Sequence, residues 1–320
     1  MNQIENYNWV VSKYFNGVRL DYWLKKKIRS SNYPFICKVI RKGYVRVNNK
    51  KVSNTSILKS GDLIMLSRKV SIGEVEHIKV PDKKFEKIIK SWIVFKDKNL
   101  IVLNKPSGIA VQGGTKIKIN IDILLDYLKF ENLERPKLVH RLDKDTSGIL
   151  LIARNLNYAK FLGEKFKSRK IEKKYLAVVN GIPKSQKGCI EIPLQLKNKN
   201  SFSTTIYKVL KSSKKHSLVL IKPITGRKHQ IRKHFSMIGN IILGENKDFA
   251  KEKLGYSNKN LFLHAIQLSY EDIDFKKQTF TADLPEYFVD KVNDMNFELD
   301  KILSNGDFFN LSNYKKVKKV

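Results

Sequence analysis

The chain has 320 residues, of which 42% are hydrophobic, and this is enough to form a core in one large domain or two unequal ones. Its 63 Lys and Arg outnumber its 30 Asp and Glu, so the formal net charge is +33. Such a charge is typical of proteins that bind a polyanion, and nucleic acid is the first candidate. No apolar run approaches the roughly 18 residues of a membrane-spanning helix, and the first twenty residues contain no apolar signal segment. We therefore expect a cytoplasmic protein that does not enter a membrane.

Residues 1–70 form a basic segment of their own, because they hold 15 Lys and Arg against 3 Asp and Glu. Apolar residues recur at helical spacing in "VRLDYWLKKKIRS" and in "PFICKVIRKG", where Gly43 predicts the end of the second helix. "YVRVNNKKV" predicts a hairpin around an Asn-Asn turn, and "SILKSGDLIML" adds another short strand. Basic side chains on and beside the two helices could face a phosphate backbone together: Lys25, Lys26, Lys27, Arg41, Lys42 and Arg46. The alternative is an ordinary solvated helix face, but the surrounding positive charge favours RNA.

The order "RLDYWL", "VIRKGYVRVNNKKV", "LKSGDLIML" resembles the small RNA-binding domain named for ribosomal small-subunit protein four. This S-four-like resemblance implies a small α/β domain over residues 1–70 that binds structured RNA. Synthetases, ribosome-assembly factors and modification enzymes share such a domain, so it does not distinguish among them. Residues 71–90 are polar, contain Pro81 and lack periodicity, and we expect them to form a linker.

From Ser91 onward the pattern indicates a second domain. "WIVFKDKNLIVLNKPSG" predicts a hairpin followed by a tight turn, and a helix is expected over residues 119–127. "GILLIAR", "KKYLAVVNG", "HSLVLIKP" and "FLHAIQLSY" predict strands, whereas "NYAKFLGEKFKSR" and "HQIRKHFSMIG" predict helices. The expected fold class is therefore α+β, with a mixed, mainly antiparallel sheet and flanking helices over residues 91–290. Residues 291–320 are expected to form a basic C-terminal tail.

Three polar clusters could carry chemistry: "HRLDKDTSG" at 140–148, "KKY" at 173–175 and "TGRKHQIR" at 225–232. A carboxylate beside guanidinium groups stays ionised, which suits a nucleophile or a stabiliser of an oxocarbenium-like sugar. Two carboxylates with separate roles would instead be typical of a glycosidase. Asp143 and Asp145 lie two residues apart in an extended loop, so we expect one to act chemically and the other to hold the turn. We assign the chemistry to Asp143, because His140 and Arg141 lie beside it.

"HRLDKDTSGILLIAR" resembles the active-site motif of the RluA-type pseudouridine synthases. The likeness continues through "LIVLNKPSGIAVQGG", "EKKYLAVVNG", "PITGRKHQIRKHFSMIGNIILG" and "LFLHAIQL" to "LPEYF", and so covers about residues 15–290. "VQGG" and the N-terminal domain are most similar to the RluC branch, which modifies uridines of large-subunit ribosomal RNA, and the RluD branch shares this architecture. The segment "LGENKDF" departs from the usual Leu-Gly-Asp of the family.

The resemblance implies a pseudouridine synthase that uses neither a metal nor an organic cofactor. Position by position, it implies that Asp143 attacks the uridine and that Arg141 enters the base stack when the target nucleotide leaves it. It also implies that Tyr175 packs on the uracil and handles a proton, and that Arg232 pairs with the aspartate. An inserted guanidinium and an aromatic platform would offset the free energy of unstacking a base. Further RNA contacts are expected from His140 and Arg227.

Each of these assignments has a structural alternative. Tyr175 could be an ordinary core residue, and Lys105 and Lys228 could be phosphate contacts or simply exposed. Four histidines are expected to be structural hydrogen bonders or RNA contacts rather than catalysts: His140, His229, His234 and His264.

Two other functions remain open besides isomerisation of uridine in large-subunit ribosomal RNA. A non-catalytic ribosome-assembly protein would have the same charge and the same N-terminal domain, and a hydrolase would release free uracil. The joint presence of Asp143, Tyr175 and Arg232 favours the synthase. The expected partner is large-subunit ribosomal RNA or its assembly intermediate, bound by a monomer.

Overall fold

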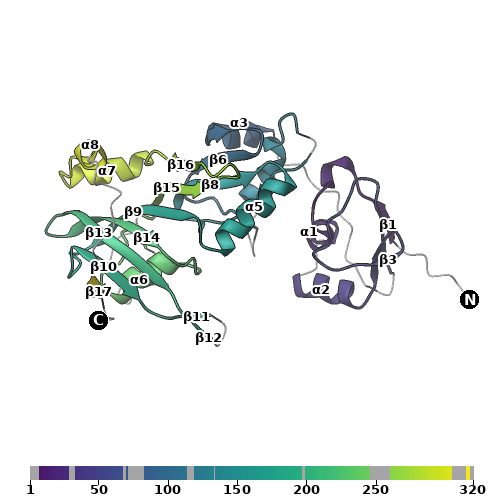
Figure 1. Cartoon of the computed structure of the whole chain (residues 1–320), viewed down its shortest axis with the longest axis horizontal. Helices are drawn as coiled ribbons and strands as arrows, with labels where there is room; N and C mark the ends of the chain where they lie inside the picture. The colour runs from purple at the N-terminus through teal and green to yellow at the C-terminus, as the bar shows by residue number, and fades with distance from the viewer. Residues whose placement is uncertain are drawn as a thin grey trace, which may run out of the picture. The chain divides into compact units, whose positions relative to one another are not determined.

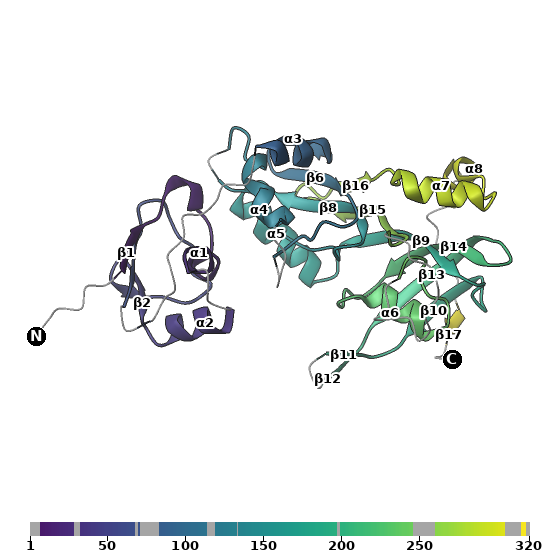
Figure 2. The same cartoon turned by 180° about the vertical axis from the view of Figure 1, so that it is seen from behind.

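The computed structural model describes residues 7–28, 33–67, 70, 83–113, 119–132, 134–196, 199–245, 260–304 and 315–317. The chain divides into two compact units, whose elements are labelled in Figures 1 and 2. Unit 1 combines residues 1–90 with 123–137 and 154–156, and unit 2 contains the remainder. Most of the expected linker, residues 71–82, lies outside the described residues, and its last part belongs to helix α3 (Lys84–Ser91). Within the described ranges no helix is both long enough and apolar enough to cross a membrane.

The N-terminal part of unit 1 packs two helices against a four-stranded antiparallel sheet of order β1-β4-β2-β3. Trp23, Leu24, Ile36, Ile40 and Ile64 are almost fully buried in its core. The predicted order of two helices, a hairpin and a strand matches the structure, and β1 is an additional strand. The elements are β1 (Tyr7–Val10), η1 (Lys13–Phe15), α1 (Leu20–Lys27), α2 (Tyr33–Arg41), β2 (Val45–Val47), β3 (Lys50–Lys51) and β4 (Leu63–Leu66).

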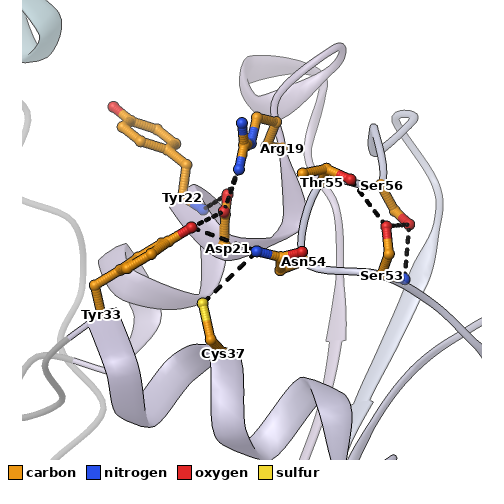
Figure 3. Close-up of polar contacts among 9 residues, drawn as sticks. All are labelled: Arg19, Asp21, Tyr22, Tyr33, Cys37, Ser53, Asn54, Thr55 and Ser56. Carbon is orange, nitrogen blue, oxygen red and sulfur yellow. Dashed lines mark hydrogen bonds and ion pairs between the residues drawn. The ribbon is translucent and has the colours of Figure 1, made fainter. Parts of the chain in front are cut away.

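A buried carboxylate ties the two helices together (Figure 3). Asp21, in the first turn of α1, is only 4% exposed and accepts hydrogen bonds from Arg19 Nε at 3.1 Å and Nη2 at 2.6 Å. The hydroxyl of Tyr33, at the start of α2, donates to the same carboxylate at 3.1 Å. Asn54 Nδ2 donates in turn to the Tyr33 hydroxyl at 3.4 Å and to Cys37 Sγ at 3.6 Å. Charge-assisted bonds of this kind hold the two basic helices in one mutual orientation.

A second polar network joins the N-terminal part of unit 1 to residues 123–137, which include the end of α4 (Ile121–Leu124) and all of η2 (Leu125–Leu128). Asp126 accepts hydrogen bonds from the Tyr14 hydroxyl and from Arg135 Nε. Arg135 Nη2 also donates to the Tyr22 hydroxyl at 3.2 Å, and its guanidinium lies 5.3 Å from the centre of that ring. The side chains of Arg135 and Asp126 are 7% and 11% exposed, so this ion pair is an internal part of unit 1.

Unit 2 is built around a long sheet of order β17-β10-β13-β14-β9-β15-β8-β6-β5, with β16 paired to β15 and β7 to β8. The β8–β15 and β10–β17 pairs are parallel. The β5–β6, β6–β8, β9–β14, β9–β15, β10–β13, β13–β14 and β15–β16 pairs are antiparallel, which confirms the predicted mixed, mainly antiparallel sheet. The strands and helices are β5 (Ile93–Lys96), β6 (Leu100–Lys105), β7 (Lys137–Leu138), β8 (Ser147–Ala153), α5 (Leu156–Lys167), β9 (Glu172–Asn180), β10 (Lys187–Glu191), β11 (Leu194–Leu196), β12 (Lys199–Ser201), β13 (Thr204–Ser212), β14 (His216–Pro223), α6 (Gln230–Met237), β15 (Leu263–Glu271), β16 (Lys277–Thr281), α7 (Glu286–Asp294), α8 (Leu299–Ser304) and β17 (Lys315–Val317).

The last thirty residues include more regular structure than the expected tail. Helices α7 and α8 lie side by side, and β17 extends the sheet by parallel pairing with β10 (Figures 1 and 2). Val292, Phe297 and Leu299 are buried in the same apolar cluster as Leu176 of β9. These apolar residues hold this part of the chain on unit 2, whereas the basic end "NYKKVKKV" had suggested a frayed tail. Residues 305–314 and 318–320 of the expected tail lie outside the described residues.

The start of β8 lies unusually close to β15. Gly148 has φ +109°, and a Cβ atom placed on it would lie 2.3 Å from the carbonyl oxygen of Ala265. Only glycine fits such a backbone approach. The loop that carries Asp143 and Asp145 leads directly into β8, so the close packing at Gly148 fixes the position of the backbone at the end of this loop.

Candidate active site

The three predicted motifs line one cavity of about 510 Å³ in unit 2. The loop before β8, strand β9 and the segment from the end of β14 into α6 each form part of its wall. The structure thus brings together all six residues that the sequence indicated for chemistry or base contact: His140, Arg141, Asp143, Tyr175, Arg227 and Arg232. Strand pairing causes this convergence, because β9 is hydrogen-bonded to β14 on one side and to β15 on the other.

Asp143 is open to the cavity, and its side chain is 21% exposed. Its Oδ1 atom lies 3.6 Å from Nε2 of His229, which precedes α6 in a left-handed backbone conformation with φ +54°. Burial lowers the pKa of His229, although the charge of Asp143 acts in the opposite direction. At neutral pH the carboxylate therefore faces a largely uncharged imidazole.

Asp145, the other carboxylate of the loop, does not belong to the cavity wall. Its backbone carbonyl oxygen instead accepts a hydrogen bond from Ser107 Oγ at 2.7 Å. The backbone N–H of Thr146 donates to the carbonyl oxygen of Asp143 at 3.2 Å and closes the turn between them. This difference in placement supports the choice of Asp143 as the reacting carboxylate.

Lys105 is fully buried, so both sequence interpretations of it, as a phosphate contact or as an exposed residue, are wrong. Its Nζ atom donates to the carbonyl oxygens of Pro106 at 2.8 Å, Ile109 at 2.9 Å and Lys144 at 3.0 Å. Burial lowers the pKa of Lys105 to about 7, while Asp145 and Asp143 act to raise it. The side chain therefore fastens the turn after β6 to the loop of the two aspartates.

Tyr175 and Lys173 of β9 both face the cavity, as residues two apart on a strand should. Tyr175 is partly buried and packs on the apolar cluster that includes Ile231 and Leu263. Burial, and then the charge of Asp143, raise the pKa of its phenol. Burial also lowers the pKa of Lys173. The tyrosine consequently keeps its proton at neutral pH and presents a flat, uncharged wall.

Arg232 is held by Glu245, a residue that the sequence reasoning did not select. Arg232 Nε donates to Glu245 Oε2 at 2.7 Å, Nη2 donates to Oε1, and the two side chains are 4% and 1% exposed. Burial alone would lower the pKa of Arg232, but the bonds to Glu245 and the charges of Asp143 and Asp145 raise it. The carboxylate that holds this arginine by two hydrogen bonds is thus Glu245, and Asp143 adds a longer-range attraction. The signal in the sequence was Glu245, the acidic residue that follows Leu-Gly in "LGENKDF".

Three other histidines, His140, His234 and His264, make internal contacts. His140 Nε2 accepts a hydrogen bond from the backbone N–H of Leu151 at 2.8 Å, its ring stacks on Phe166, and burial lowers its pKa to about 3. These contacts favour a structural role for His140 over its predicted RNA contact. His234 and His264 are fully buried and bond to Ser203 and Ser147, respectively. In the ranges that the structure describes, no group of three or more His, Cys, Asp or Glu side chains is placed to hold a metal ion.

The basic residues predicted to bind RNA through the N-terminal domain belong to unit 1. Lys25, Arg41 and Lys42 are exposed. Lys26 and Lys27 lie 5.5 Å from the ring centres of Tyr22 and Trp23, Lys42 lies 5.9 Å from that of Tyr44, and Arg46 Nη1 donates to the carbonyl oxygen of Asn49 at 3.3 Å. Several of these cations are thus positioned by aromatic rings before any ligand binds.

Most of the cavity wall lies in a segment of the chain that matches a known protein family. Residues 99–237 match the family model described as RNA pseudouridylate synthase, and this range contains the cavity motifs from His140 to Arg232. The chain is 37% identical over 294 residues to ribosomal large subunit pseudouridine synthase C of Rickettsia felis, an alignment that covers 85% of this chain and 95% of that relative. The protein of the same name from Vibrio parahaemolyticus is 32% identical over 270 residues, which cover 80% of this chain and 85% of that relative. The solved structure of human RNA pseudouridylate synthase domain containing 4 matches with a TM-score of 0.59 and 29% identity, over 67% of this chain and 96% of that one.

Proposed function

The chain belongs to the RNA pseudouridylate synthase family, and from this premise we propose that it converts uridine to pseudouridine in large-subunit ribosomal RNA, with Asp143 as the reacting residue. One observation carries the assignment of residues: Asp143, Tyr175 and Arg232 come from three separate elements and line one cavity. A protein that only binds RNA has no need of this convergence. The names of the curated relatives support the large ribosomal subunit as the source of the substrate.

In the proposed reaction the carboxylate of Asp143 attacks the uridine, and the bond between C1′ and N1 breaks. The uracil then turns within the cavity and forms a new bond from C5 to C1′, while the bond between Asp143 and the nucleotide breaks and the free carboxylate is restored. The hydrogen on C5 leaves as a proton and N1 gains one, so product and substrate have the same composition. The reaction consumes no oxidant, reductant or water.

The other cavity residues have supporting roles in this proposal. Arg141, which is exposed at the cavity, takes the place of the target base in the RNA stack. Tyr175 supplies the aromatic face on which the uracil packs, and its raised pKa keeps the phenol uncharged there. Arg232 places a positive charge near Asp143, and Glu245 fixes the position of that charge.

We further propose that the basic side chains of unit 1 bind the phosphate backbone of the RNA. The net charge of +33 supports this, because each phosphate that a Lys or Arg neutralises releases a bound counterion. Of the branches indicated by the sequence, the names of the relatives favour the one whose members are called synthase C. We propose that the protein acts as a monomer in the cytoplasm, on ribosomal RNA or on its assembly intermediate.

The proposal is tested by incubating the protein with a transcript of large-subunit ribosomal RNA and mapping pseudouridine by chemical derivatisation and reverse transcription. A small-subunit transcript serves as the control. The expected result is pseudouridine at a few positions of the large-subunit RNA and none in the control. Tight binding without pseudouridine would indicate a binding protein, and free uracil in the supernatant would indicate a hydrolase.

A further inference from the structure

Thr146 carries a buried hydroxyl group that has no hydrogen-bond partner. The residue is 2% exposed and belongs to the cavity wall, and its Oγ1 atom is buried and unpaired within the described part of the chain. Among the described residues, only two such orphaned side-chain atoms belong to residues of this wall, namely Thr146 Oγ1 and Arg227 Nε. An unpaired buried hydroxyl is unfavourable in a folded protein, and a ligand that pairs with it would explain why a residue of a cavity wall carries one.

Neighbouring hydroxyl groups show that this arrangement is particular to Thr146. Thr225 also lines the cavity and is 3% exposed, but its Oγ1 atom donates to Gln230 at 2.7 Å and accepts from the backbone N–H of Thr204 at 3.0 Å. Ser147, the next residue along the chain, pairs its hydroxyl with His264 at 2.9 Å. The surrounding protein thus provides partners for these hydroxyl groups and leaves the buried hydroxyl of Thr146, a residue of the cavity wall, without one.

We infer that Thr146 is a further substrate-contacting residue, whose hydroxyl pairs with the polar edge of the uracil when the target base enters the cavity. This inference rests on the proposed function. The phosphates and sugar of the RNA are polar and stay in contact with solvent, where Arg141 and Lys228 are exposed at the cavity. The base is the part of the nucleotide that leaves solvent, and so the part that can reach a buried atom.

The chemistry of the two groups is complementary. Uracil presents two carbonyl oxygens and one N–H along its edge, and a threonine hydroxyl can donate one hydrogen bond and accept others. The apolar side chains of Ile231 and Leu263, together with the ring of Tyr175, are suited to the faces of the base. The hydrogen bond between the Thr146 N–H and the Asp143 carbonyl places the hydroxyl at a fixed position relative to the reacting carboxylate. Thr146 would therefore help to orient the uracil against Asp143.

The test compares Thr146→Val, which replaces the hydroxyl with a methyl group of similar shape, with Thr146→Ser, which keeps it. Activity is measured as tritium release from large-subunit ribosomal RNA labelled at C5 of uridine, and stability as the urea midpoint of unfolding. For Thr146→Val we expect an unchanged or higher midpoint, because no bond is lost in the free protein, and a kcat/KM about threefold to tenfold lower, the size of one hydrogen bond. Thr146→Ser should stay within about twofold of the wild type.

Thr205→Val is the matched control for stability. Thr205 is fully buried, and its hydroxyl accepts a hydrogen bond from Gln230 Nε2 at 2.9 Å, so its removal should lower the urea midpoint. The inference is overturned if Thr146→Val loses stability as Thr205→Val does, if it retains the wild-type kcat/KM, or if Thr146→Ser is impaired equally. Absence of tritium release by the wild type would overturn the proposed function and this inference together, whereas release by the wild type with an unimpaired Thr146→Val overturns the inference alone.

Discussion

Replacing Lys105 with Met is expected to change how the stability of the protein depends on pH. In the folded chain burial lowers the pKa of Lys105 from 10.5 to about 7, so the unfolded chain binds one more proton between these two values. Stability therefore rises with pH through this window in the wild type. The buried ammonium lowers the free energy of unfolding by its full amount below pH 7, and this effect disappears as the pH approaches 10.5. Met has a side chain of similar length and no proton to lose.

The magnitude follows from the two pKa values. Between pH 7 and pH 9 the linkage relation gives the wild type a gain of about 2 kcal/mol in free energy of unfolding relative to Lys105→Met. Urea denaturation of both proteins at the two pH values measures this gain. The two proteins share their other titrating groups, so the difference between their changes in free energy of unfolding reports on Lys105. Loss of the donor to the carbonyls of Pro106, Ile109 and Lys144 shifts the free energy of unfolding of Lys105→Met equally at both pH values, so it does not affect this difference. Parallel pH profiles of the two proteins would refute the reasoning, because they would show that Lys105 stays charged throughout.

Three further predictions concern the buried carboxylates and the basic face of unit 1. Glu245→Gln leaves the buried Arg232 without its counter-charge and should cost about 3 to 5 kcal/mol in urea denaturation; a loss below about 1 kcal/mol would contradict this. Asp21→Asn should speed hydrogen exchange in α1 and α2, because it weakens the bonds from Arg19 and Tyr33, and unchanged exchange would show that this carboxylate does not hold the helices. The double variant Arg41→Gln, Lys42→Gln should reduce the salt slope of rRNA binding by about 0.7 to 0.9 per lost phosphate contact, whereas an unchanged slope would remove these two residues from the RNA interface.

Much of the fold could be predicted from the sequence, because its strands have a strong apolar pattern. Every residue of β8 is buried, and its apolar run "GILLIA" was predicted to be a buried strand. The hairpin of β5 and β6 was predicted from two apolar runs around a polar turn. Strand β1 was missed because it has only four residues, and its pairing with β4 is a long-range contact that local periodicity does not encode.

The cavity residues that lie within a recognisable sequence motif could be predicted from the sequence. Asp143, Tyr175 and Arg232 were selected in this way, and the structure places them in one cavity. Glu245 and Lys105 were not assigned correctly, because their positions depend on burial and on partners far along the chain. A lysine looks like a surface residue in sequence, and only the folded backbone shows the three carbonyl oxygens that surround it.

The central claim is that the carboxylate of Asp143 performs the chemistry on uridine. It is tested most directly by tritium release from C5-labelled large-subunit ribosomal RNA, because forming a bond from C5 to C1′ must expel that hydrogen. The wild type and Asp145→Asn should release tritium, whereas Asp143→Asn should release none while it still binds the RNA. Release by Asp143→Asn together with loss of release in Asp145→Asn would contradict the claim and assign the reaction to the other carboxylate.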